Sequence, residues 1–583
     1  MKKIYLFLVV LMSMMTITSC EKFLTRPPLT SFTDDTFWVS EDAVRAFSWS
    51  LYSIVPGFGD FAYSPGQSSM ATDLVPGSYQ NLNNITTAST SSMSYANIRR
   101  ANLMLERIPT VEGMSEASKT HYTALAKFFR GWEYFRFLQT FGGMPLVLTY
   151  NDPADLDGVY VERSTRAQTA AQIASDLEDA IAGLKVDEGE LEINKDIAKA
   201  LAARFYLFEG TWEKYHNDGS KATEYITKAA TYANDLITSG RYSLQTAVVE
   251  QMDGWWQRFS TFNLANNKEM ILYKRYDINR NPHTNQAYAI TSQGCAGLSK
   301  FAAERYVCTD GLPIYQSPLY QGDDTMEDVR ANRDARFRSI FFDDGYGFTG
   351  HPTTVAGTNK TCLNSSGYIV KLYMNGTQNP ETDPAFSGNA AAGHTDAPAF
   401  MISEQYLIYA EAKAELGTLT QADLDNTINL LRARAGIAPL KTDGIRAFSG
   451  ANGTTLIEYP ESVVALEEAT GGMPSPILYE IRRERMNELF MCSAVNHSDI
   501  YRWAKGKYLD TNINPDLWLG ANIDALVTDP TFRQNNMVGK YFAMYKINGA
   551  NVWNDKYYLM PIPETQITLY NNKGYTLAQN PGW

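Results

Sequence analysis

The feature that most limits how this chain can fold is a run of helical segments from Ser115 to Gly240. Four amphipathic stretches follow one another there, and Gly, Asn or Ser bounds each of them. The first spaces its apolar residues at three- and four-residue steps and ends at Gly142 and Gly143. Because helix follows helix with no strand pattern between them, the sequence predicts a mostly α-helical protein rather than a barrel of alternating strands and helices.

Two distant segments resemble each other, which indicates repeated helical hairpins. AKALAARFYLFEG (198–210) and QYLIYAEAKAELG (405–417) are both rich in Ala and aromatic residues, and both close on glycine. Another amphipathic stretch, QADLDNTINLLRARAG, follows the second. Helix pairs of this kind cannot bury their apolar faces alone, so we predict a tetratricopeptide-like stack of hairpins.

Long stretches without lasting periodicity interrupt this scaffold. They are rich in Gly, Pro, Asn, Ser and Thr and carry scattered aromatic residues. They cover residues 57–95, 241–398 and 441–474. Long ordered loops usually carry function on a rigid frame, so we expect loop-rich, aromatic-bearing insertions on the helical scaffold.

The N-terminus has the features of a secretory signal peptide: two lysines, then an apolar run over 4–17. That run is too short to cross a bilayer, which takes about 20 residues. The sequence Ile-Thr-Ser-Cys ending at Cys20 resembles a bacterial lipobox, so we expect cleavage before Cys20 and acyl chains on its thiol. An ordinary signal peptide with an incidental cysteine is the alternative.

These features divide the chain into three parts. Residues 1–20 are the expected lipoprotein signal peptide. Residues 21–240 are an N-terminal helical region with a tether, and residues 241–583 are a C-terminal region of loops and further tetratricopeptide-like helices.

The net charge of −13 argues against a nucleic-acid partner, because polyanions reward clustered Lys and Arg. Local basic patches remain possible. Neither a CxxC nor an HExxH is present, so no zinc site or other cofactor is indicated. Four cysteines remain after Cys20, and their spacing leaves any disulfide pairing open. They are Cys295, Cys308, Cys362 and Cys492.

Three further segments could carry chemistry. GDDTMEDVR (322–330) supplies carboxylates for calcium but lacks the EF-hand spacing and its turn glycine. GYGFTG (345–350) satisfies GxGxxG, yet no helical pattern follows it to meet a pyrophosphate. EIRRERMNELF (480–490) places opposite charges three residues apart, so they can pair along a helix or tie it to its neighbours, which favours a scaffold role.

No GxSxG, P-loop or kinase motif occurs, so hydrolysis by a nucleophile and phosphoryl transfer have no local support. A glycoside hydrolase is a remote alternative, because its two carboxylates can come from distant positions.

The loops instead combine aromatic rings with Asn, Asp, Gln and Arg, a pairing that suits the apolar faces and hydroxyl edges of sugars. The candidate ligand-binding residues are Asp73, Tyr79, Gln80, Trp255, Trp256, Arg280, Asn285 and Tyr288. The alternative for each aromatic residue taken singly is packing within its loop. We expect Ala at both Trp255 and Trp256 to weaken glycan binding and to leave the fold intact.

Five stretches together resemble one family. They are FRGWEYFRFLQTFGGMPLVL, AKALAARFYLFEGTW with YLIYAEAKAEL, EIRRERMNELF followed by DIYRW, and the tail YYLMPIPETQITLYNNKGYTLAQNPGW. In this order they are similar to the SusD/RagB family of Bacteroidetes outer-membrane lipoproteins, and the tail is the most specific of them. Trp583 stands where the family commonly ends on tyrosine, and Asn571-Asn572 replaces a frequent Asn-Pro.

This resemblance implies a tetratricopeptide-containing helical fold, a surface-exposed outer-membrane lipoprotein and no catalysis. Family members cap a SusC-like TonB-dependent barrel and capture glycans, or peptides in some members, for import. The helical stack would then contact the barrel and leave the loop-rich face for ligand. The family's ligand residues vary and have no fixed motif, so none is transferred here.

Overall fold

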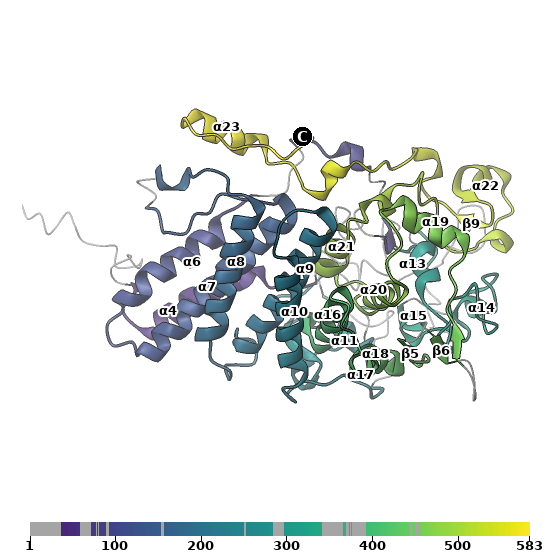
Figure 1. Cartoon of the computed structure of the whole chain (residues 1–583), viewed down its shortest axis with the longest axis horizontal. Helices are drawn as coiled ribbons and strands as arrows, with labels where there is room; N and C mark the ends of the chain where they lie inside the picture. The colour runs from purple at the N-terminus through teal and green to yellow at the C-terminus, as the bar shows by residue number, and fades with distance from the viewer. Residues whose placement is uncertain are drawn as a thin grey trace, which may run out of the picture.

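The computed structural model describes residues 37–58, 72–76, 79, 81–88, 93–152, 157–249, 252–283, 297–340, 365–368, 372–373, 375, 392–442, 446–448 and 454–583. In this part of the chain helices predominate, and the strands are short and pair in twos and threes. The prediction of a mostly α-helical protein is confirmed (Figure 1). The division of the chain at residue 240 stays a prediction.

The N-terminal part is a row of long helices that pack in chain order. α6 (Ala96–Arg107) packs against α7 (Glu116–Phe141), which packs against α8 (Arg166–Gly183). The row continues from α8 to α9 (Lys195–His216) and from α9 to α10 (Ala222–Ile237). Figure 1 shows these helices side by side, as the sequence of amphipathic stretches predicts.

Local signals fix where these helices begin and end. Ser115 caps α7 by accepting a hydrogen bond from the backbone N–H of Ser118 at 3.1 Å. Thr165 and Gln168 form a capping box at the start of α8. Gly142 ends α7 with a φ of 79°, a conformation that only glycine adopts without strain.

The helical stack continues across a long gap in the sequence. α16 (Ile402–Glu415) packs against α9 and α10, and also against α20 (Pro476–Glu488). Arg204 of α9 is bonded to Glu404 of α16, with its Nε 2.6 Å from the carboxylate. The two segments that resemble each other in sequence are therefore neighbours in one stack.

The other elements are short. The further helices are α4 (Glu41–Ser48), α11 (Gln257–Ser260), α13 (Lys300–Arg305), α14 (Met326–Arg330), α15 (Ala335–Ile340), α17 (Gln421–Asp425), α18 (Ile428–Arg434), α19 (Glu461–Ala469), α21 (Ser493–Arg502), α22 (Pro530–Asn536) and α23 (Glu564–Asn572). The 3₁₀ helices are η1 (Trp49–Ile54), η2 (Leu82–Asn84), η3 (Ile108–Thr110), η4 (Asp157–Val159), η5 (Leu264–Asn266), η7 (Gly506–Leu509), η8 (Asp524–Leu526), η9 (Lys546–Asn548) and η10 (Asp555–Tyr558).

The strands pair antiparallel as β1 with β3, β2 with β4, β6 between β5 and β7, and β8 with β9. They are β1 (Leu74–Val75), β2 (Met270–Lys274), β3 (Gly297–Leu298), β4 (Ala397–Met401), β5 (Leu440–Lys441), β6 (Arg446–Phe448), β7 (Thr454–Leu456), β8 (Met537–Val538) and β9 (Tyr541–Phe542).

Buried ion pairs surround α20, which carries the charged segment of the sequence. Glu488 is fully buried and its carboxylate meets three arginines from other parts of the chain. Arg258 lies 2.9 Å from it and Arg336 2.8 Å, and Arg434 completes the group. These contacts tie α20 to α11, α15 and α18.

The remaining charges of α20 also serve the scaffold. Glu480 pairs with Arg483 at 3.1 Å, the pair that the three-residue spacing predicts. Arg485 pairs with Asp499 of α21 at 2.8 Å. It does not pair with Glu488, because three other arginines already contact the Glu488 carboxylate. The segment therefore pairs both along the helix and with its neighbours, as predicted.

Candidate functional site

The predicted ligand-binding residues differ in how far they are buried, and they do not form one site among the described residues. Asp73 is buried and bonded to Arg305 at 2.7 Å. Tyr79 is half-buried and meets Trp518 edge to face, with ring centroids 5.9 Å apart. Of the predicted residues that the structure describes, only Arg280 is fully exposed. Gln80, Asn285, Tyr288 and the lipidation residue Cys20 lie outside the described residues.

Trp255 and Trp256 lie in the core rather than on a surface that faces a ligand. Their exposed fractions are 1% and 4%. The indole of Trp255 donates a hydrogen bond to the backbone oxygen of Glu488 at 3.0 Å, and its ring packs against Phe259. A stretch of aromatic and polar residues in sequence does not distinguish an exposed loop from one folded over a core. In this conformation neither tryptophan offers a ring face to a sugar.

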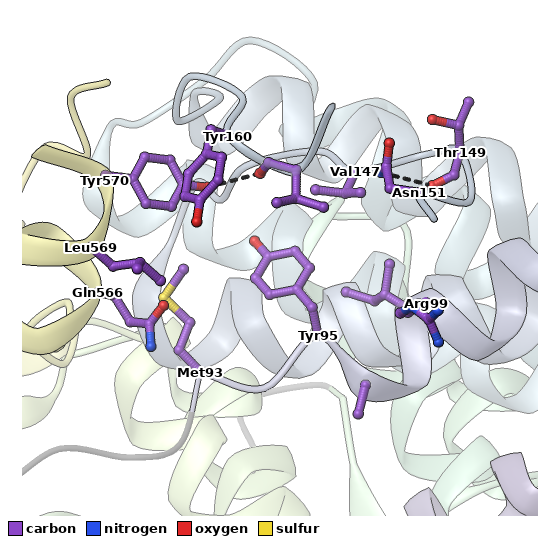
Figure 2. Close-up of a pocket in the computed structure, with 13 residues that line it drawn as sticks. Met93, Tyr95, Arg99, Val147, Thr149, Asn151, Tyr160, Gln566, Leu569 and Tyr570 are labelled. Carbon is purple, nitrogen blue, oxygen red and sulfur yellow. Dashed lines mark hydrogen bonds between the residues drawn. The ribbon is translucent and has the colours of Figure 1, made fainter. Parts of the chain in front are cut away.

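A pocket of about 340 Å³ opens elsewhere, between α6 and α23 (Figure 2). We call it the α6–α23 pocket. It is lined by Met93, Tyr95, Ala96, Ile98, Arg99, Val147, Thr149, Asn151, Val159, Tyr160, Gln566, Leu569 and Tyr570. Three segments far apart in the sequence thus form one concave site, which is the usual shape of a small-molecule site.

Tyrosines give the pocket its aromatic walls. The hydroxyl of Tyr95 donates to the backbone oxygen of Pro145 at 2.9 Å, and that of Tyr570 donates to Val159 at 3.3 Å. Tyr160 meets Tyr570 edge to face at 5.3 Å between ring centroids. Burial raises the pKa of Tyr570 to about 12 and that of Tyr95 above its ordinary value, so both phenols stay neutral at physiological pH.

Polar groups stand at the rim. One guanidinium nitrogen of Arg99 donates to the hydroxyl of Tyr150 at 2.9 Å, and the guanidinium lies over the Tyr150 ring at 4.8 Å. Asn151 donates to the backbone oxygen of Thr149 at 3.4 Å. Aromatic faces beside amide and guanidinium donors can bind the apolar face and the hydroxyls of a sugar ring.

The C-terminal tail holds the α23 wall in place. Asn580 accepts from Arg163 at 2.6 Å and donates to the backbone oxygens of Phe141 and Met560 at 3.0 and 2.7 Å. Gln579 bonds both the N–H and the oxygen of Ile562. We call Arg163, Gln579 and Asn580 the tail latch. It explains why the tail is the most specific part of the sequence resemblance, because α23 lies just ahead of it.

We expect Asn580→Ala to loosen α23 and to lower the free energy of unfolding by about 1–3 kcal/mol, because Arg163 and two buried carbonyls lose a partner. Hydrogen exchange of residues 564–572 should accelerate. The matched control is Asn571→Ala, an exposed asparagine at the end of α23. Equal exchange in both variants would contradict the role of the latch.

The pocket residues escaped prediction from sequence. Tyr95 opens α6, Tyr160 follows η4 and Tyr570 lies in α23, so no single aromatic-rich loop contains them. The tail is the one stretch near this site that the sequence singles out, and it indicates the family rather than a ligand site.

The structure gives two findings on metal ions and membranes. Among the described residues, no group of three or more His, Cys, Asp or Glu side chains is arranged to hold a metal ion. In the acidic segment 322–330, Asp323 pairs with Lys540 and accepts a hydrogen bond from Tyr541. Within the same described part, no helix combines the length and apolar character needed to cross a membrane.

Cys308 is buried and Cys492 is half-buried, and each is a free thiol. Cys295, Cys362 and the GYGFTG loop lie outside the described residues.

The row of helices that pack in sequence places this protein in the class of tetratricopeptide-like helical proteins. Residues 257–583 match the sequence model of the SusD family, and residues 64–207 match a model described as starch-binding associating with outer membrane. The first match alone covers more than half of the chain, so the protein belongs to the SusD family.

Curated relatives agree with this assignment. A SusD-like protein of Bacteroides ovatus is 26% identical over 242 residues, which cover 39% of this chain and 42% of that protein. SusD-like protein P38 of Formosa agariphila is 25% identical over 261 residues, or 42% of this chain and 47% of that protein. The matched segments thus span less than half the length of these relatives.

Solved structures show the same fold over nearly the whole chain. A SusD-like protein of Bacteroides fragilis has a TM-score of 0.66 at 20% identity and covers 96% of this chain and 100% of its own. A SusD-like carbohydrate binding protein of the same organism has a TM-score of 0.67 at 18% identity, with coverage of 92% and 99%.

Proposed function

We propose that this protein is a non-catalytic, surface-exposed outer-membrane lipoprotein that binds oligo- or polysaccharide and passes it to a SusC-like TonB-dependent transporter. The observation that carries the proposal is the α6–α23 pocket, where tyrosine walls and amide and guanidinium donors meet in a SusD-family scaffold. Acylation of Cys20 would supply the anchor. The carbohydrate-binding relative of Bacteroides fragilis has the same fold, which supports this choice of ligand.

The dimensions and chemistry of the pocket suit a short stretch of glycan. A volume of about 340 Å³ lies at the lower end of the range for ligand sites, roughly 300–1,000 Å³. Tyr95 is half-buried and offers aromatic surface to C–H faces, whereas Tyr160 and Tyr570 are 7% and 6% exposed and offer little of their rings. Asn151 and Gln566 carry both donors and acceptors, so they can follow ring hydroxyls of either orientation.

Capture of a peptide is the alternative, and the backbone near the pocket argues against it. A peptide bound in extended form needs free backbone donors and acceptors. The carbonyls of Val147 and Thr149, which line the pocket, already accept hydrogen bonds from Asn102 at 2.9 and 3.0 Å. A sugar can be bound through side chains instead, so the occupied backbone carbonyls matter less for a glycan than for a peptide.

The test is a double variant, Gln566→Ala with Leu569→Ala, in the mature full-length protein. Gln566 is half-buried and Leu569 is 44% exposed, so the free energy of unfolding should change by less than about 1 kcal/mol. Affinity for the glycan selected from a panel of plant, host and microbial polysaccharides should fall about tenfold or more, equivalent to about 1.4 kcal/mol.

The matched control is Leu430→Ala, an exposed leucine on α18. It should bind like the unaltered protein, as measured by affinity electrophoresis and calorimetry. Equal affinity of the double variant and the control would exclude the pocket as the glycan site. Shortened products after incubation would instead indicate a glycoside hydrolase, and binding of peptides alone would establish the alternative.

A further inference from the structure

Three cations surround the α6–α23 pocket without a carboxylate partner. Arg99 lines it, the backbone of Arg163 pairs with Pro145, to which Tyr95 is bonded, and Lys573 stands over the ring of Tyr160 at 5.9 Å. Among the described residues, none of the three cations forms an ion pair. None of the residues that line the pocket is acidic.

The buried arginines of the neighbouring helices α7 and α8 are paired with carboxylates. Arg130 of α7 makes two hydrogen bonds to Asp176 at 2.7 and 2.8 Å. Arg166 of α8 is bound in the same way by Glu209 at 2.6 and 3.0 Å. In a chain with a net charge of −13, the three cations without a carboxylate partner give this pocket local positive charge.

The geometry of Arg99 leaves it free to bind a ligand. Its one hydrogen bond within the described residues goes to Tyr150, and stacking on the Tyr150 ring holds the guanidinium in place. A guanidinium carries five N–H donors, so most remain for an anion, which it can bind through two parallel bonds. Figure 2 shows Arg99 at one end of the pocket, and Tyr160 and Tyr570 at the other.

Arg163 adds charge without taking the anion itself. Its donors are used by the backbone oxygens of Phe141, Gly143 and Ala578 and by Asn580. All four acceptors are neutral, so no hydrogen-bonded carboxylate compensates the positive charge of Arg163. Arg99, which lines the pocket, is the group positioned for direct contact.

We infer that the α6–α23 pocket selects an acidic sugar, in which a ring stacks on Tyr95 and an anionic substituent, a uronate or a sulfate ester, binds Arg99. This inference rests on the proposed function and narrows its ligand class. A neutral sugar of the same shape would leave the guanidinium without a charged partner. Arg99 is exposed, so salt should weaken the contact.

The experiment is calorimetry on the mature full-length protein with four probes: trigalacturonic acid, its methyl ester, a sulfated galactose trisaccharide and neutral galactotriose. The two acids should bind at least tenfold more tightly than their neutral counterparts. Arg99→Gln should reduce this preference to about threefold or less. Lys507→Gln removes one positive charge from an exposed residue of η7 and should preserve the preference.

The two acidic probes distinguish the anion. Binding of the uronate should be lost as pH falls through its carboxyl pKa, whereas a sulfate ester stays charged and should bind throughout. Equal affinity for neutral and acidic probes, or an unchanged preference in Arg99→Gln, would overturn the inference and leave glycan capture standing. Failure of both acids while a neutral glycan binds the pocket would overturn it too. If no saccharide binds, the proposed function fails with it.

Discussion

Replacing Trp255 or Trp256 by Ala should lower the free energy of unfolding by about 3–5 kcal/mol in each case. Both indoles are buried, and Trp255 packs on Phe259 and bonds to the backbone of α20. Truncation leaves a cavity that the surrounding core can fill only in part. Urea denaturation followed by circular dichroism measures the effect, which should move the midpoint without a change in secondary structure at zero denaturant.

An exposed tryptophan provides the control. Trp49 is 43% exposed and packs against Tyr52, so Trp49→Ala should lower the free energy of unfolding much less than either core variant. The opposite result is informative as well. A Trp255→Ala protein with an unchanged midpoint and reduced glycan affinity would mean that the tryptophans face a ligand in solution, as the sequence analysis expects.

Glu488→Ala should be equally severe, with a loss of about 3–5 kcal/mol. After the substitution, Arg258 and Arg434 keep Glu269, and Arg336 keeps Asp334 and Glu484. Arg432 also shares Glu484, so the buried cluster is left with one more positive than negative charge, and an uncompensated buried charge is costly. The contribution of the carboxylate should also depend on pH. Burial tends to raise the pKa of Glu488, but Arg434, Arg258 and Arg336 outweigh it, and the pKa is lowered.

A lowered pKa gives the pH dependence a definite sign. The stabilisation is present above the pKa of an unfolded glutamate, about 4.3, and is lost as pH falls through the lower pKa of the folded state. The difference in stability between the unaltered protein and Glu488→Ala should therefore shrink below about pH 4. Glu116→Ala is the control, because that side chain is 91% exposed and should cost little. A loss as small for Glu488→Ala would show that Glu269, Asp334 and Glu484 neutralise the arginines without Glu488.

The features that sequence could predict are those that local chemistry determines. Ser115 and Thr165 cap helices through hydrogen bonds to residues three positions on, so their role is readable from spacing. The charge spacing of α20 likewise identifies it as scaffold, because Glu480 and Arg483 meet within one turn. The sequence likeness of the two segments that form α9 and α16 predicts the helical stack, and the two helices are in contact.

The pocket could not be predicted because its walls meet only through tertiary packing. In the sequence, nothing marks Tyr95 at the start of α6 or Tyr570 in α23 as ligand-binding residues. They line one pocket only because α23, next to the tail latch, lies beside α6 in the folded chain. Composition could not separate Trp255 from a ligand platform either, since a buried and an exposed aromatic residue share the same neighbours in sequence. Asp73 shows the same limit, because its partner Arg305 is far along the chain.

The two helices that form the walls of the α6–α23 pocket are synthesised far apart in time. Asn580 follows Arg163 by 417 residues, and α6 precedes both. At roughly 5–20 residues per second, the first wall exists for on the order of 20–80 seconds before the second has been synthesised. A nascent chain that stops short of α23, however well its helical row has packed, has only half of this site and cannot hold a ligand there during synthesis.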